Sequence, residues 1–283
     1  MLLFKKNKDL ALELALHKAE GKTVGFVPTM GALHEGHLSL IRRAKKETDV
    51  VVCSIFINPS QFNDASDLEK YPRTPAQDTA LLLDVGCDIL YMPAVEEVYP
   101  PLLKLPAPPD LGYLAKPMEG AHRPGHFEGM AQVVRRLLDI VNPEKLFMGQ
   151  KDFQQFTIVR HMLYQLKSKV EIVLCPIVRE ADGLAMSSRN VRLTPEQRQL
   201  APLIFKILSG AKEKVHSHFP KDIMREALEQ LSVHGMVPEY FDIVDGHSLE
   251  PLDLFEDTDY AVACTAVNLG GIRLIDNLIL KGG

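Results

Sequence analysis

The feature that most constrains the fold is a series of short apolar runs separated by stretches with helical spacing. Runs at residues 23–28, 50–57, 89–92 and 170–178 are, in several cases, too apolar to leave one face in water. Strands buried on both faces belong to parallel sheets, whose connections are helices that cover the sheet. Between the first two runs, apolar residues of the stretch 33–47 recur at helical spacing. We therefore expect a doubly wound α/β domain.

The C-terminal part of the chain changes character. Beyond residue 197, two amphipathic helical stretches precede a set of strand-like runs. These runs span residues 240–244, 261–267 and 271–275. Helices followed by strands are typical of a small α+β domain, so we predict a first domain of residues 1–177 and a smaller C-terminal domain of residues 178–283. The proline-rich stretch 99–109 predicts an irregular surface excursion.

Charge and cysteine usage favour a small substrate and a cytoplasmic location. The formal net charge is -5 and the isoelectric point is near 6.1, so no broad basic field is available for nucleic acid or an anionic membrane. The cysteines are far apart, form no CxxC pair and are interpreted as reduced core residues; they are Cys53, Cys87, Cys175 and Cys264. The N-terminal residues have no apolar signal segment, and no later run is long enough to span a bilayer.

A string with two glycines and two histidines stands where the first apolar run leads into a helix. Residues 27–37 have the sequence VPTMGALHEGH. Open α/β sheets bind ligands at this kind of junction, and a helix start offers unpaired N–H groups to phosphate. Gly31 and Gly36 let a phosphate chain approach the backbone, while His34 and His37 fall on one helical face. The two histidines can donate hydrogen bonds as pyrophosphate leaves; the alternative, that they only cap a structural helix, stays open.

Other nucleotide or metal motifs fit this string poorly. The sequence HEGH is one residue too short for the HExxH zinc signature, so we expect no metal site made by protein side chains. The glycines match neither the Walker pattern nor GxGxxG.

Two further polar strings carry candidate phosphate ligands. In GQKDFQQ, residues 149–155, Lys151 is a candidate point charge for phosphate, and Asp152 could fix a hydroxyl or the lysine itself. The string MSSRN, residues 186–190, offers hydroxyls and a guanidinium after a turn. Solvated polar loops have similar compositions, and that interpretation is open for each string taken alone.

Taken together, the strings resemble the HIGH-type adenylate-forming and nucleotidyl-transferring enzymes, which have a Rossmann-like sheet. The strings VPTMGALHEGHLSL, NPSQF, YPRT, RPGHFEGM, GQKDFQQ and MSSRN are similar, more narrowly, to those of the pantothenate synthetase (pantoate-beta-alanine ligase) family, over essentially the whole chain. The resemblance implies that ATP and Mg²⁺ convert pantoate to pantoyl adenylate and pyrophosphate, after which beta-alanine attacks to give pantothenate and AMP. It also implies a homodimer and a C-terminal domain that closes over the nucleotide.

The resemblance assigns roles to individual residues. His37, His34 and Lys151 would be catalytic, with His37 as the proton donor. The ATP-binding residues would be Met30, Gly31, Ala32, Leu33, His34, Glu35, Gly36, His37, Gly149, Gln150, Lys151, Asp152, Val178, Met186, Ser187, Ser188 and Arg189. Gln61 and Gln155 would bind pantoate, and Gln61 could also contact beta-alanine.

Several weaker assignments stay open at this point. Asp78 is a candidate contact of magnesium-bound phosphates, and Arg123 could meet a carboxylate or lie at the surface. The apolar wall for pantoate, or ordinary core packing, accounts equally well for Pro28, Met30, Phe56 and Val134.

Three other functions compete with the ligase. Another HxGH-type nucleotidyltransferase would attach a nucleotide to an acceptor and stop there. A tRNA synthetase fits poorly, because the chain is short and acidic. A non-catalytic ATP sensor would need the glycines but not His37, Lys151, Gln61 and Gln155 together.

Overall fold

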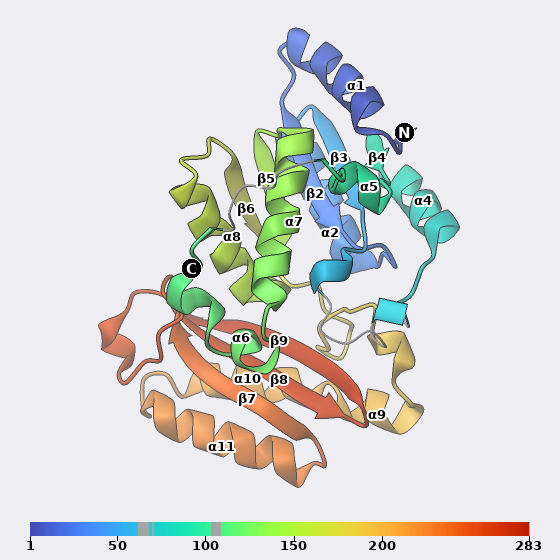
Figure 1. Cartoon of the computed structure of the whole chain (residues 1–283). Coiled ribbons are helices and arrows are strands. Elements are labelled where there is room, and N and C mark those ends of the chain that lie inside the picture. Colours follow the sequence, from blue (N-terminus) through green and yellow to red (C-terminus); the bar gives the residue numbers. More distant parts are fainter. Residues whose placement is uncertain (62–67, 70, 103–108, 283) are drawn as a thin grey trace. The chain divides into compact units, whose positions relative to one another are not determined.

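The computed structural model describes residues 1–61, 68–69, 71–102 and 109–282 of the 283-residue chain (Figure 1). The chain forms two compact units. The first unit comprises Met1–Leu111, Pro124–Gly149 and Ile158–Pro176; the second comprises Gly112–Arg123, Gln150–Thr157 and Ile177–Gly283. Two short segments, 112–123 and 150–157, thus group with the C-terminal residues, which the sequence pattern did not indicate. The division into domains at residue 177 stays a prediction.

The first unit is built on a six-stranded sheet in the order β1-β4-β3-β2-β5-β6, in which neighbouring strands are parallel (Figure 1). The strands are β1 (Leu2–Phe4), β2 (Val24–Thr29), β3 (Val50–Ile55), β4 (Ile89–Tyr91), β5 (Lys145–Gly149) and β6 (Glu171–Cys175). The four predicted apolar runs are β2, β3, β4 and β6. Strands β1 and β5 were not predicted, because β1 is short and exposed at the edge and β5 begins with a lysine.

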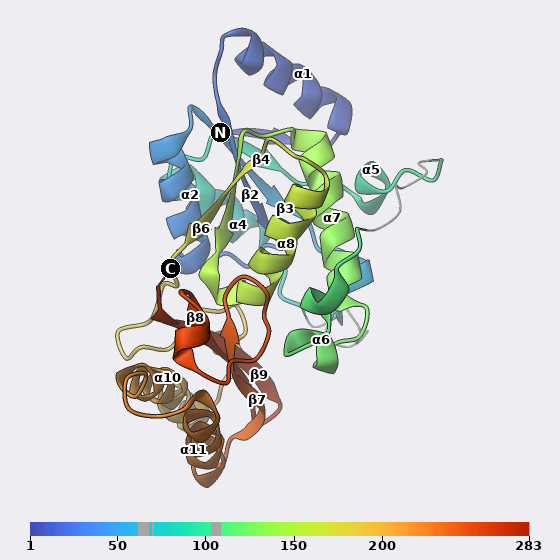
Figure 2. The same ribbon diagram turned by 90° about the vertical axis from the view of Figure 1, so that its left-hand side faces the viewer.

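Helices cover both faces of this sheet. They are α1 (Asn7–Ala19), α2 (Glu35–Glu47), α4 (Pro75–Asp84), α5 (Val95–Val98), α7 (His126–Val141) and α8 (Phe153–Gln165), whose first residues belong to the second unit. Helices α2 and α7 lie on opposite sides of the strands (Figure 2). On the α2 side, Ile41 and Ala44 pack against Val27 and Val51 in one fully buried cluster. Each of the larger side chains, Ile41, Val27 and Val51, contributes about 1.5–3 kcal/mol through burial.

The order of the strands creates a switch point beside β2. From β2 the chain continues to β3 and β4 on one side, and β5 and β6 lie on the other. Ligands of doubly wound sheets bind outside the carboxyl ends of the strands at such a point. The strands that flank it, β2 and β5, end at Thr29 and Gly149, and the first two candidate strings continue from these two ends.

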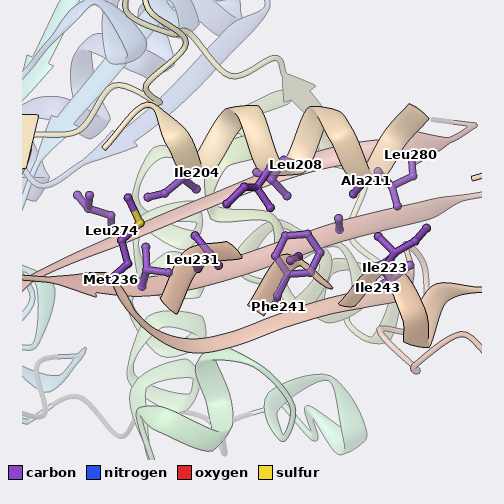
Figure 3. Packing of buried hydrophobic residues seen from close by; sticks show 14 of the residues in the cluster. Ile204, Leu208, Ala211, Ile223, Leu231, Met236, Phe241, Ile243, Leu274 and Leu280 are labelled. Atoms are coloured by element: carbon purple, nitrogen blue, oxygen red, sulfur yellow. The ribbon is translucent and has the colours of Figure 1, made fainter. Parts of the chain in front are cut away.

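The second unit contains a three-stranded antiparallel sheet in the order β7-β8-β9. Its elements are α6 (Glu119–His122), α9 (Pro195–Leu200), α10 (Leu203–Glu213), α11 (Pro220–Val233), β7 (Val237–Asp245), β8 (Ala261–Leu269) and β9 (Ile272–Lys281). Helices α10 and α11 contact each other and the sheet, and Leu208, Leu231 and Phe241 lie in their common core (Figure 3). The predicted fold class, a Rossmann-like parallel sheet with a smaller α+β part, is confirmed.

The described residues also form short 3₁₀ segments. The 3₁₀ segments are η1 (Pro59–Gln61), η2 (Gly112–Ala115), η3 (Gln150–Asp152), η4 (Asn190–Arg192) and η5 (Phe255–Asp257).

All four cysteines are buried and have free thiols. No helix among the described residues is long and apolar enough to cross a membrane. Part of the proline-rich stretch, residues 103–108, lies outside the described residues.

Candidate active site

The loop after β2 is a tight turn whose backbone has positive φ angles. Gly31 and Ala32 both have positive φ angles, 80° and 49°. A side chain at Gly31 would begin 3.0 Å from Ile55 Cγ2 and 3.1 Å from a carboxylate oxygen of Asp78, so tight contacts add to the preference for glycine that the positive φ sets.

The carboxylate of Asp78 in α4 holds this loop. It accepts hydrogen bonds from the backbone N–H groups of Ala32 (3.0 Å) and Leu33 (2.8 Å) and from the Thr74 hydroxyl (3.1 Å), and it is 1% exposed. Charge-assisted bonds of this kind are stronger than neutral ones. Asp78 therefore positions the loop of the first string that follows β2. A contact of Asp78 with magnesium-bound phosphates stays a prediction.

The two histidines of the first string form a capping box at the start of α2. Nδ1 of His34 accepts from the N–H of Gly36 (3.2 Å), and Nδ1 of His37 accepts from the N–H of His34 (3.3 Å). Their ring centroids are 4.1 Å apart. Because each Nδ1 accepts, the neutral form of each ring carries its proton on Nε2. Capping by Nδ1 is therefore compatible with donation from Nε2.

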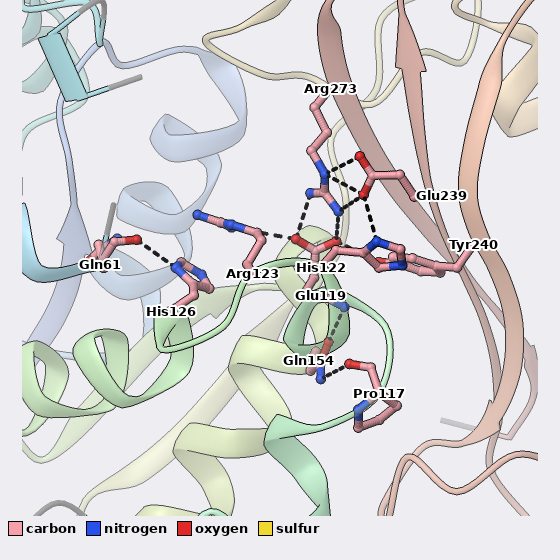
Figure 4. Close-up of polar contacts among 10 residues, drawn as sticks. All are labelled: Gln61, Pro117, Glu119, His122, Arg123, His126, Gln154, Glu239, Tyr240 and Arg273. Atoms are coloured by element: carbon pink, nitrogen blue, oxygen red, sulfur yellow. Dashed lines mark hydrogen bonds and ion pairs between the residues drawn. The ribbon is translucent and has the colours of Figure 1, made fainter. Parts of the chain in front are cut away.

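Gln61 lies in a buried polar region of the first unit. Its side-chain amide donates to Met30 Sδ at 3.3 Å, and its backbone carbonyl accepts from Nδ1 of His126 at 2.9 Å (Figure 4). Gly129 of α7 allows the close approach, because an added Cβ would stand 2.5 Å from the carbonyl oxygen of Ser60. Gln61 is thus fixed through its backbone, while its side chain makes only a weak sulfur contact with the described residues.

Two buried residues of this region were missed from the sequence. Asn58 is 1% exposed; its amide donates to the Gly129 carbonyl at 3.2 Å and accepts from the hydroxyls of Ser60 and Tyr99. His126 is the other. Both belong to strings already quoted, NPSQF and RPGHFEGM. The signal available in the sequence was a polar residue inside a family string, and the structure shows that both residues are buried. Of the proposed apolar wall, Phe56 and Val134 are buried and Pro28 and Met30 are half-buried, which fits either interpretation.

In the second unit, η3 presents the amide and charges of the second string. Burial lowers the pKa of Lys151, the charge of Asp152 opposes that change, and Arg189 adds to it. Within the described part of the chain the Lys151 ammonium has no hydrogen-bond partner. A cation held in this way is suited to an anionic ligand.

The two remaining amides of the string differ in what they do. Gln154 is buried and holds the segment 112–123: it accepts from the Glu119 N–H at 3.1 Å and donates to the carbonyls of Leu114 (2.8 Å) and Pro117 (2.9 Å) (Figure 4). Gln155 is half-buried, and its side-chain amide makes no hydrogen bond with the described residues.

A buried charge network surrounds Glu119. Its carboxylate accepts two bonds from Arg273, both at 2.7 Å, and one from the Tyr240 hydroxyl at 2.7 Å, while Arg273 also binds Glu239 (Figure 4). Burial alone would raise the pKa of Glu119, but the hydrogen bonds and charge of Arg273 outweigh it and lower the pKa. Glu119 is therefore an ionised structural residue.

Arg123 stands at the edge of this network and forms a long ion pair with Glu119. Its closest carboxylate oxygen, on Glu119, is 3.6 Å away, and the guanidinium makes no hydrogen bond to a described residue. Burial lowers the pKa of Arg123, and the like charges of Arg273 and Arg189 lower it further. A half-buried guanidinium whose ion pair is this long keeps N–H donors for an anionic ligand, which favours a binding role over a purely solvated one.

The third string is a compact turn in the second unit. The Met186 N–H donates to the Val178 carbonyl at 3.0 Å, beside an antiparallel bridge between Arg179 and Ala185. The Ser187 hydroxyl accepts from the Arg189 N–H at 3.3 Å. The structure thus brings Val178 next to the string that contains Arg189.

The acidic side chains do not form a cage for a metal ion. Among the described residues, no group of three or more His, Cys, Asp or Glu side chains could hold one. Mg²⁺ usually binds one or two carboxylates together with waters and the phosphates of a nucleotide.

The doubly wound sheet, with a helix N-terminus following the strand at its switch point, defines the class: a doubly wound α/β protein whose candidate strings lie where such sheets bind ligands. Residues 3–279 match the family described as pantoate-beta-alanine ligase. Pantothenate synthetases from Porphyromonas gingivalis W83 and Bacteroides thetaiotaomicron are 51% and 47% identical, covering 98% and 97% of this chain and 99% and 97% of their own.

Solved structures agree with this family match. The pantothenate synthetase of Thermus thermophilus superposes with a TM-score of 0.92 at 40% identity, covering 99% of this chain and 100% of its own. The pantoate-beta-alanine ligase of Francisella tularensis, in complex with beta-gamma ATP and beta-alanine, has a TM-score of 0.81 at 33% identity and covers 100% of this chain and 99% of its own. The chain belongs to the pantoate-beta-alanine ligase family, and it is accordingly a ligase of pantothenate biosynthesis.

Proposed function

We propose that this enzyme joins (R)-pantoate and beta-alanine in two steps at the expense of ATP, through a pantoyl-adenylate, and releases pyrophosphate and AMP. Family membership over residues 3–279 is the observation that carries the proposal. The Francisella relative binds an ATP species and beta-alanine, which supports ATP as the co-substrate here. Magnesium, the homodimer and the cytoplasmic location are expectations that accompany the proposal.

ATP binding involves three strings in this proposal. The loop 30–34, held by Asp78, and the first N–H groups of α2 offer hydrogen-bond donors and a partial positive charge to phosphate oxygens. Lys151 and Arg189 add full positive charges, and Ser187 and Ser188 add hydroxyls. Val178 contacts the adenine through its backbone.

Adenylation follows from this arrangement of donors. A carboxylate oxygen of pantoate attacks the α-phosphorus, and the bond from this phosphorus to the bridging oxygen of pyrophosphate breaks. Negative charge grows on the leaving group, where Nε2–H of His37 and the ammonium of Lys151 stabilise it. Magnesium, when bound to the triphosphate, neutralises part of the same charge.

Pantoate is held by amides and not by a cation. Gln61 and Gln155 donate to its carboxylate and accept from its hydroxyls. A tight ion pair would stabilise the carboxylate before reaction and make it a poorer nucleophile. The weak sulfur contact of the Gln61 amide leaves that amide available for exchange with a substrate.

Amide formation is the second step. The neutral amine of beta-alanine attacks the acyl carbon, AMP leaves with the electron pair of the acyl–oxygen bond, and the amine nitrogen gives up one proton to solvent water. Arg123 is the candidate partner for the beta-alanine carboxylate, because it is a half-buried cation with no hydrogen bond among the described residues.

Product analysis tests the proposal. Purified protein with pantoate, beta-alanine and ATP should yield an amide and AMP, not ADP. Exchange of label between ATP and pyrophosphate should need pantoate but not beta-alanine. If a nucleotide is transferred to an acceptor and no amide forms, the chain acts as another HxGH-type nucleotidyltransferase instead.

A further inference from the structure

Asn277 of β9 binds the backbone of the second string from within the same unit. Its side-chain N–H groups donate to the carbonyls of Gln150 and Lys151, both at 2.9 Å, and its side-chain oxygen accepts from the Gln150 amide at 3.1 Å. Asn277 is 2% exposed. The buried side-chain amide of Asn277 therefore makes all three hydrogen bonds to two consecutive residues. The second of these, Lys151, is the candidate phosphate-binding lysine.

Neighbouring charges hold Asn277 itself in place. The Asp276 carboxylate accepts the Asn277 N–H at 2.8 Å and forms a two-point ion pair with Arg179 at 2.6 and 3.0 Å. Arg179 also donates to the Asn277 carbonyl at 3.2 Å, and its guanidinium lies 3.8 Å from the centre of the Phe205 ring. Because Asp276 is 4% exposed, this set of bonds is largely shielded from water.

We infer that Asn277 is a positioning residue for the ligase reaction, which fixes the backbone from which the Lys151 side chain extends toward the phosphates of ATP. The inference rests on the proposed function. A lysine has a flexible four-carbon stem, so the direction of its Cα–Cβ bond limits where the ammonium can reach. With both carbonyls of the turn held, that direction is set before ATP binds, and the cost of ordering falls.

Asp276 has a second effect in the same arrangement. Its negative charge favours the ammonium form of Lys151, opposing the burial that lowers the pKa of this lysine. The pair Asp276–Asn277 thus acts on both the charge and the direction of one side chain, although β9 itself supplies no group assigned to substrate.

The test compares Asn277→Ala with Asn268→Ala. Asn268, near the end of β8 in the same sheet, accepts one bond from the Gly271 N–H (2.8 Å), outside the second string, so it is a matched control. Single-turnover formation of pantoyl adenylate should slow roughly 10- to 100-fold in Asn277→Ala, because a displacement of about 1 Å can cost this much. Asn268→Ala should stay within about twofold of the parent.

A double-mutant cycle with Lys151→Ala separates positioning from general damage to the fold. If Asn277 acts through Lys151, Asn277→Ala should add almost nothing to the loss already caused by Lys151→Ala. If the adenylation losses of Asn277→Ala and Lys151→Ala multiply in the double variant, the inference is overturned alone. The same holds if Asn277→Ala adenylates as fast as Asn268→Ala while Lys151→Ala is slow. A Lys151→Ala enzyme with the parent adenylation rate overturns the assigned role of Lys151 and this inference together.

Asn277→Asp covers the case in which the alanine variant fails to fold. Aspartate keeps the shape and the acceptor for Gln150 but sets an oxygen against two carbonyls. It should slow adenylation at least tenfold by the same reasoning, whereas the parent rate in a folded Asn277→Asp protein also overturns the inference.

Discussion

Arg273 of β9 donates two parallel hydrogen bonds to the carboxylate of Glu119, each 2.7 Å long, although the two residues are 154 positions apart in the sequence. The Glu119 carboxylate also accepts a hydrogen bond from the Tyr240 hydroxyl, and the Glu119 backbone N–H donates to the side-chain oxygen of Gln154. The segment 112–123, which the sequence places between two parts of the first unit, is thereby bound within the second.

Glu119→Gln should destabilise the protein by about 1.5–3 kcal/mol, because it weakens the charge-assisted bonds from Arg273, which keeps its ion pair with Glu239. Urea unfolding at pH 7 measures this loss. Glu226→Gln is the matched control: Glu226 pairs with Lys214 at the surface, where solvent screens the charges, so this change should cost far less stability than Glu119→Gln.

The same variant gives a pH dependence with a definite sign. The pKa of Glu119 is lowered on folding, so its ionised form contributes stability above the unfolded pKa of about 4.3, and the contribution is lost as the pH falls through the folded value. The difference between parent and Glu119→Gln should be constant from pH 7 to about 5 and shrink in more acidic solution. A difference that does not change with pH would show that shape, not charge, matters at this position.

His37→Ala should slow adenylation by roughly 10²–10³, about 2.7–4 kcal/mol of barrier, while ATP affinity falls much less. The reason is that Nε2–H of His37 would act on charge that develops only as the P–O bond breaks. Single-turnover adenylation and thermal unfolding of the same variant are the measurements. His34→Ala, which removes the acceptor of the Gly36 N–H, should show the stability loss of about 0.5–2 kcal/mol expected of a lost cap.

Turnover of folded His37→Ala within about threefold of the parent, together with a stability loss like that of His34→Ala, would restrict His37 to capping.

Gln61→Ala should keep ATP binding and lose pantoate binding by about 1–3 kcal/mol, because the stranded carboxylate and hydroxyl groups lose their buried partner. Calorimetry with ATP and then pantoate measures both. Gln165→Ala, at an exposed amide that donates to the Asp110 carbonyl, is the control and should change neither affinity. Unchanged pantoate affinity in Gln61→Ala would remove this assignment.

Lys151 should impose an alkaline limb on kcat/KM for ATP. Burial lowers its pKa below the ordinary value of about 10.4, so the charge that binds phosphate is lost as the pH rises through the lowered value and is fully present below it. Lys151→Arg, whose charge persists to a pH above about 12, should have a lower plateau but no such limb. An identical limb in both enzymes would assign the titration to another group.

The local patterns of the sequence determined the sheet and the positions of the candidate strings. Strands such as β3 are apolar on both faces, and α2 repeats its apolar residues at helical spacing, because burial acts directly on neighbouring residues of one element. Strand β5 was not predicted because its apolar run, residues 146–148, is short and lies between Lys145 and Gly149. The first string was visible because glycine and histidine stood at the end of a predicted strand, and the second because a lysine stood in a polar string beside a glycine.

Only the tertiary structure decided which distant groups serve those strings. Asp78 reaches the loop at Ala32 and Leu33, Asn277 reaches Lys151, and Arg273 reaches Glu119, each through hydrogen bonds between residues far apart in the chain. Such bonds depend on the direction of side chains within about 3 Å, and no periodicity of the sequence encodes that direction. The sequence determined which residues could do the chemistry, and the folded chain decided which residues hold them still.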